Sequence, residues 1–215
     1  MVETLLLSPG ELLCLGWLMK AEYIDYAYAA AAPGLGGNFH VFTKTASAAM
    51  AKRGILQEDF GGELELDPSA ARLLKPIFFG GGELTVDLCK LTGDRAVTAY
   101  KFHFMGELAV MVRCQADTLA ISETDSQGVL EAVAGLLPQG QAKGAAALSP
   151  DDMTRALAVK SSCLGGAASR AMFLADANGA IFRECLEGRM EGLQTEDVLA
   201  EVKKMLEECE HGISG

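Results

Sequence analysis

The charged residues around the middle of the chain are the first candidates for chemistry. Lys101 and His103 alternate with aromatic residues from Val97 to Phe104, so an extended strand would project both from one face. With Asp87 and Arg113 on the same sheet face, they would supply an acid, a base and charge stabilisation. No serine nucleophile motif or catalytic carboxylate pair accompanies them. We therefore interpret His103 as a solvent-facing strand residue and keep an enzyme with this scattered site as an alternative.

The spacing of histidine, cysteine and glycine residues does not predict a metal site or a phosphate-binding loop. His40, His103 and His211 each lack a second histidine or a cysteine at metal-ligand spacing, and the six cysteines form no CxxC pair. The glycine clusters at 34–37 and 80–82 do not follow a strand and open a helix, as a phosphate loop would. We interpret them as turns and hinges, and we expect no catalytic residue, no metal and no cofactor.

Composition and charge restrict the classes of partner. The chain has 215 residues, half of them apolar, and a net charge of −11 without any basic run. Such a chain is poorly suited to nucleic acid or to anionic membranes. No stretch is apolar for long enough to cross a bilayer, so we expect no membrane insertion. Met1 to Leu7 lacks the features of a signal peptide, which predicts a cytoplasmic protein with free thiols.

One aromatic segment is a candidate surface for binding another protein. Tyr23, Tyr26 and Tyr28 precede a glycine-rich break, and Leu35 and Phe39 surround it. Aromatic side chains on such a segment are typical anchors at protein interfaces. The alternative is that these rings pack against the sheet.

A second segment suggests a DNA-binding regulator. Residues 48–66 read as the end of a helix followed by a short strand, which resembles the recognition helix and wing of a winged-helix domain. The basic residues of this region are Lys44, which precedes the segment, and Lys52 and Arg53 within it. Because the whole chain is acidic, we favour a structural use of this unit and keep the regulator as an alternative.

These residues must be positioned by an α+β fold, an antiparallel β-sheet flanked by helices. Ser8 and Glu11 form a capping-box pattern that opens the first helix. Residues 84–122 contain four alternating segments joined by short turns, which predicts an antiparallel meander at the centre of the sheet, with helices mainly on one face. A hairpin is expected at 169–186 over Asn178-Gly179. Helices are expected at 43–53, 67–78, 126–137, from Ser149 onward, and at 195–211.

Two halves of one domain can be recognised in this order. Residues 1–137 form the first half, 138–148 a linker rich in Gln, Gly and Ala, and 149–215 the second half, expected to run helix, hairpin, helix. The apolar stripe at 129–137 has the spacing of the stripe at 198–206. This similarity suggests two quasi-repeated halves, although any amphipathic helix shows such a stripe.

The organisation resembles the EspG-like chaperones of ESX, or type VII, secretion. The residues that carry the resemblance are the opening helix at Glu11–Gly16, the strand and helix at Leu56–Leu74, and the meander at Leu84–Leu119 with the helix Val129–Leu137. The resemblance implies a pseudo-twofold α/β architecture. It also implies a chaperone or adaptor that binds a helical-hairpin secretion substrate and covers its apolar tip. It assigns no individual binding residue.

Overall fold

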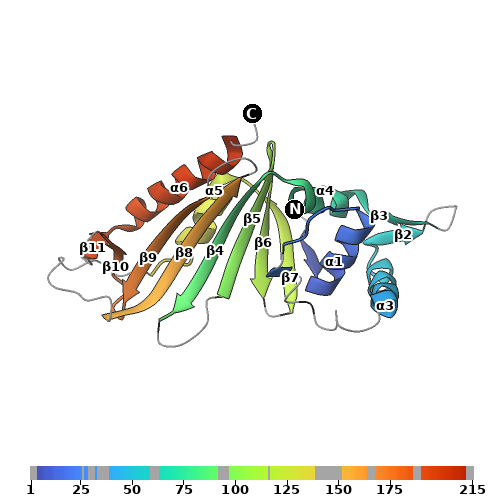
Figure 1. The fold of residues 1–215 in the computed structure, drawn as a ribbon, viewed down its shortest axis with the longest axis horizontal. Coiled ribbons are helices and arrows are strands. Elements are labelled where there is room, and N and C mark those ends of the chain that lie inside the picture. The colour runs from blue at the N-terminus through green and yellow to red at the C-terminus, as the bar shows by residue number, and fades with distance from the viewer. Residues whose placement is uncertain are drawn as a thin grey trace.

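A nine-stranded antiparallel sheet forms the centre of the computed structural model (Figure 1). The model describes residues 4–25, 27–28, 32, 39–58, 63–91, 97–115, 117–138, 152–163, 168–185 and 190–211. The strand order is β1-β7-β6-β5-β4-β8-β9-β10-β11. The strands are β1 (Leu5–Leu7), β4 (Gly82–Lys90), β5 (Val97–Met105), β6 (Leu108–Gln115), β7 (Thr118–Thr124), β8 (Met153–Cys163), β9 (Ser169–Asp176), β10 (Ile181–Glu184) and β11 (Met190–Leu193).

Short turns build the predicted meander and hairpin. Strands β4, β5, β6 and β7 pair in sequence order, which confirms the meander. Gly106 has a φ of 61° in the turn between β5 and β6, and Gly179 has a φ of 81° in the predicted hairpin between β9 and β10. Both positions require the left-handed conformation that glycine adopts without a steric penalty.

Two helices cover one face of the sheet. Helix α5 (Ser126–Ala134) follows β7 and helix α6 (Thr195–His211) follows β11, and the two contact each other. Strand residues that point toward them belong to one buried cluster, which includes Leu84, Val86, Phe102 and Phe104. The alternation of aromatic residues along β5 therefore identifies the face on which α5 and α6 pack.

The opposite face is covered by the N-terminal segment, so the expectation that helices pack mainly on one face is wrong. Helices α1 (Pro9–Leu18), α3 (Phe39–Lys52) and α4 (Pro68–Phe79) lie there, with a small sheet of β2 (Leu56–Glu58) and β3 (Leu64–Leu66). Val110 and Val112 of β6 are fully buried against this layer. The physical reason is that β6 is apolar on both faces, as a strand with helices on both sides must be.

The C-terminal half contains a long strand where the sequence predicts a helix after Ser149. Residues 153–163 form β8, which pairs with β4 on one side and with β9 on the other. The local signals for a helix are the capping pattern at Ser149–Asp152 and the helix-forming residues at 155–158. Pairing on both edges and burial of Leu157 and Val159 override those propensities. The β4–β8 ladder also joins both halves into one continuous sheet.

The same order of elements occurs twice around the centre of the sheet. Strands β4 to β7 form a meander followed by α5, and strands β8 to β11 form a meander followed by α6. The first strands of the two units pair antiparallel, with Val86 opposite Val159 at the middle of the ladder. The described residues before β4 form an additional segment that covers part of one face next to β5, β6 and β7.

Candidate functional site

Helix α1 begins and ends with specific backbone interactions that direct the following chain across the sheet. The capping box forms as predicted, with Ser8 N–H donating to Glu11 at 2.8 Å. At the other end, Lys20 has a φ of 58°, and Ala21 N–H donates to Gly16 O at 2.9 Å. This Schellman-type arrangement turns the chain sharply after Lys20. Residues 21–25, 27 and 28 follow this turn, and Asp25 and Tyr28 reach the polar face of β4 and β5.

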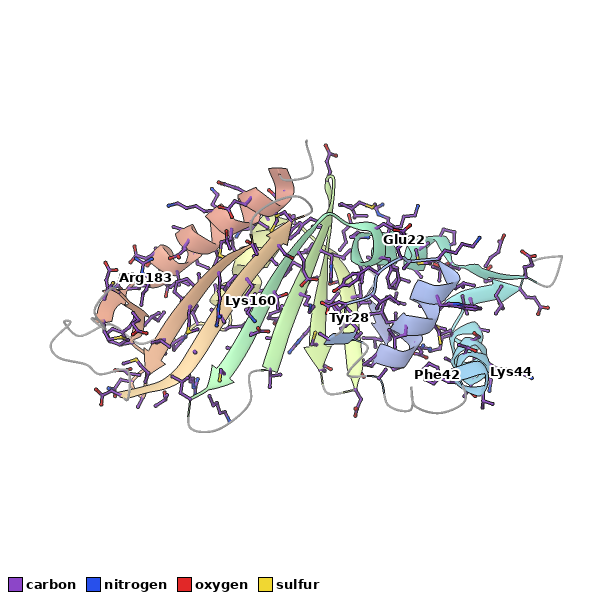
Figure 2. The ribbon with its side chains drawn as sticks, in the orientation of Figure 1. Glu22, Tyr28, Phe42, Lys44, Lys160 and Arg183 are labelled. Atoms are coloured by element: carbon purple, nitrogen blue, oxygen red, sulfur yellow. The ribbon has the colours of Figure 1, made fainter. Side chains whose placement is uncertain are left out.

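A network of polar side chains joins this segment to the sheet. Lys101 donates to Asp25 and also to Glu83 Oε1, at 3.0 Å. Tyr28 Oη lies 3.0 Å from His103 Nε2, and His103 Nδ1 lies 3.6 Å from Glu83 Oε2. Figure 2 labels Tyr28 between the strands and α1. The network therefore connects β4 and β5 with a segment that is more than 50 residues distant in sequence.

Burial fixes the protonation states within the network. Burial lowers the pKa of His103 to about 4, because removal from water outweighs the attraction of Glu83. The imidazole is neutral at pH 7, so Nδ1–H facing Glu83 leaves Nε2 to accept from the Tyr28 hydroxyl. Burial also raises the pKa of Tyr28. Tyr28 therefore keeps its proton and acts as a donor.

The charges of Lys101 and Asp25 stabilise each other. Burial alone would lower the pKa of Lys101, but Glu83 and Asp25 raise it above its ordinary value. Burial alone would raise the pKa of Asp25, but the hydrogen bond from Lys101 lowers it. A buried ammonium with two carboxylates around it is a paired charge that holds its neighbours in place.

This arrangement places some of the predicted site residues together and separates others. Lys101 and His103 share a face, as predicted, but they are only 5% and 4% exposed, so the expectation of a solvent-facing His103 is wrong. The reason is that Asp25 and Tyr28 cover that face. Asp87 lies on the same face and accepts from Lys160 at 2.6 Å. Arg113 pairs with Tyr100 across the β5–β6 ladder, so it lies on the face that α5 and α6 cover. It is therefore on the other side of the sheet from Lys101, His103 and Asp87.

The aromatic residues predicted to bind a partner differ in their exposure to solvent. Tyr23 is 72% exposed, whereas Tyr28 is 3% exposed and packs on the sheet, which is the alternative stated for these rings. Phe39 begins α3, and Tyr26 and Leu35 lie outside the described residues.

Sequence reasoning missed an exposed tryptophan in the same region. Trp17 is 66% exposed near the end of α1, on the other side of the turn from Tyr23. An apolar position in an apolar helix gives no signal of exposure, but its place one residue from the helix end could have suggested it. We define the Trp17–Tyr23 surface as the exposed side chains of these two residues.

The segment compared with a winged helix contains α3 followed by the antiparallel pair β2 and β3. Its arginine, Arg53, makes contacts within the protein. Arg53 donates to Glu11 at 2.6 Å and to the carbonyl of Leu6 at 2.9 Å. These contacts attach α3 to α1 and β1. An arginine held in this way is used to connect elements of the fold.

Comparison with known proteins adds no identity. No family model matches this chain, and no curated protein matches it. Within the described residues, no group of three or more histidine, cysteine or acidic side chains is arranged to hold a metal ion. Among the helices of that part, none combines the length and apolarity needed to span a membrane. No disulfide joins any of the six cysteines, all of which are described.

Proposed function

We propose that this chain is a cytoplasmic protein-binding chaperone or adaptor, with a helical-hairpin secretion substrate as its partner. The observation that carries the proposal is the Trp17–Tyr23 surface. Large aromatic side chains that are about two thirds exposed or more are the residue types that dominate binding energy at interfaces. An apolar hairpin tip is the kind of partner that such rings would cover.

The polar network supports this use because it anchors the surface. Asp25 and Tyr28 are fixed to β5 through Lys101 and His103, only a few residues after Tyr23. Ile24 packs close to Gly16 on the inner side of the same turn. The exposed rings are therefore presented from a segment with fixed ends, which reduces the entropy lost when a partner binds.

The repeated order of elements is a second support. The resemblance to EspG-like chaperones implies a pseudo-twofold α/β architecture, and two meander-plus-helix units meeting at β4 and β8 agree with that implication. The net charge of −11 favours a protein partner over nucleic acid.

Co-expression tests the proposal. Helical-hairpin proteins encoded beside this chain are produced with it, and we expect one of them to remain soluble and to co-elute with it. The double variant Trp17→Ala/Tyr23→Ala should weaken that complex by at least about thirtyfold, since a hot-spot side chain contributes about 2 kcal/mol or more. Met172→Ala is the matched control, because Met172 is 42% exposed on β9, several strands from α1 (Figure 1).

Two results would contradict the proposal. One is elution of the chain alone while every neighbouring hairpin protein precipitates. The other is a complex that Trp17→Ala/Tyr23→Ala and Met172→Ala weaken equally, since the binding energy would then lie outside the Trp17–Tyr23 surface.

A further inference from the structure

A cavity of about 640 Å³ lies at one end of the sheet, beyond the polar network along β4 and β5. Its lining comes from the end of β4, the start of β8, the end of β9 and the residues that follow α5. The volume is within the range of sites that hold small molecules. The apolar lining consists mainly of Leu88, Leu136, Leu137, Leu157, Phe173 and Ile181.

The cavity arises from a mismatch between the lengths of helix and strand. Helix α5 and strand β4 both have nine residues. A nine-residue helix is about 14 Å long and a nine-residue strand about 30 Å, because the rise per residue differs about twofold. Helix α5 therefore covers only part of the strands, and beyond its end the apolar sheet face is left with a hollow below Leu136 and Leu137.

Two cations lie together at this end of the sheet. Lys90 on β4 and Arg155 on β8 are directly opposite each other in the antiparallel ladder, and both line the cavity. By alternation with Leu88 and Leu157, both project from the face that carries the apolar lining. Both side chains can donate to an anion held at this edge of the cavity.

A smaller polar hollow of about 330 Å³ adjoins the cavity and shares Pro138, Arg155 and Ala175 with it. Asp176 lines this hollow, and its Oδ1 accepts from the backbone N–H groups of Asn178 and Ala180, at 2.8 and 2.9 Å. The Asp176 carboxylate is therefore used by its own turn. In the described part of the chain, no carboxylate lies within ion-pair distance of Arg155.

We infer that this cavity binds a small amphipathic anion, with its apolar body under Leu136 and Leu137 and its anionic head group between Lys90 and Arg155. The apolar lining provides affinity by removing the body of the ligand from water. The two cations give the orientation, since a carboxylate or sulfonate accepts strong hydrogen bonds from both. The site is independent of the proposed partner surface.

A pair of fluorescent probes tests this inference with the full chain. 1-Anilinonaphthalene-8-sulfonate has an apolar body and an anionic group, and N-phenyl-1-naphthylamine has the same rings without charge. The double variant Lys90→Gln/Arg155→Gln should lower the affinity for the anionic probe by about tenfold or more and change the affinity for the neutral probe by less than about twofold. Dodecanoate should displace the anionic probe at a concentration about tenfold or more below that at which dodecanol displaces it.

Three further variants show where each probe binds. Lys203→Gln/Lys204→Gln removes the same charge from the exposed side of α6 and should leave both affinities unchanged. Ala175→Phe fills the cavity and should weaken both probes; Leu136→Trp serves the same purpose at a half-buried position if Ala175→Phe does not fold. Equal loss in the two charge variants, or anionic binding that is insensitive to Lys90→Gln/Arg155→Gln, would overturn the inference.

Discussion

His103 makes the stability of this protein depend on pH in a range where few other groups titrate. In the folded chain its pKa is lowered to about 4, against 6.5 in the unfolded chain. Below pH 6.5 the unfolded state therefore binds a proton that the folded state excludes, and stability falls as the pH falls. The difference between these pKa values corresponds to a loss of about 3 kcal/mol when the pH has passed below about 4.

The substitution His103→Gln removes this titration. A glutamine oxygen can accept from Tyr28 as Nε2 does, so the contact to residues 21–28 has a replacement. Between about pH 7.5 and about pH 5.5, we expect wild type to lose about 1 kcal/mol more than the variant. Asp25 does not interfere, since its lowered pKa confines its own contribution to pH values below its ordinary 3.8.

Urea unfolding at a series of pH values gives the free energy of unfolding of wild type and of His103→Gln. The change of this free energy with pH is then compared between the two proteins, so the contributions of all other groups cancel. Keeping the pH at about 5.5 or higher avoids the acidic range where a chain of this composition approaches zero net charge and precipitates. NMR of the imidazole carbon-bound protons gives an independent reading of the His103 pKa. Parallel pH slopes in wild type and variant, or an imidazole that titrates near pH 6.5, would refute the buried neutral His103.

Two other predictions concern the elements that position the Trp17–Tyr23 surface. Lys20→Gly should raise the free energy of unfolding by about 1 kcal/mol, because Lys20 has a φ of 58° that glycine adopts without penalty; an unchanged or lower urea midpoint would contradict this. Lys101→Met should lower the free energy of unfolding by about 2–4 kcal/mol, since it leaves Asp25 and Glu83 without their buried counter-charge, and a loss below about 1 kcal/mol would show that solvent already screens the pair.

Much of the fold could be predicted because it depends on local patterns. The alternation along β5, the Asn-Gly turn and the capping box of Ser8 all act between residues that are close in sequence, and the structure contains each of them. Helix α6 was predicted with its observed limits because its stripe of apolar residues is long and regular.

The errors occur where distant parts of the chain decide the outcome. His103 has a polar side chain on a strand, which locally indicates exposure, but Tyr28 covers it from 75 residues away. Strand β8 has helix-forming residues, but β4 and β9 supply hydrogen bonds on both of its edges. Arg113 was placed with Lys101 because the register between β5 and β6 cannot be read from composition, and a shift of one residue changes the face.

The central ladder between β4 and β8 also bears on the history of the chain. Two units with the same element order meet at their first strands, antiparallel and centred on Val86 and Val159. A symmetric homodimer of one such unit would have this geometry, since antiparallel pairing of identical strands creates a dyad. Joining two copies into one polypeptide would preserve the shared sheet while freeing each copy to change separately. Under such a duplication, the N-terminal layer would be an addition to the first copy, whereas both copies contribute to the cavity, through Lys90 and Arg155.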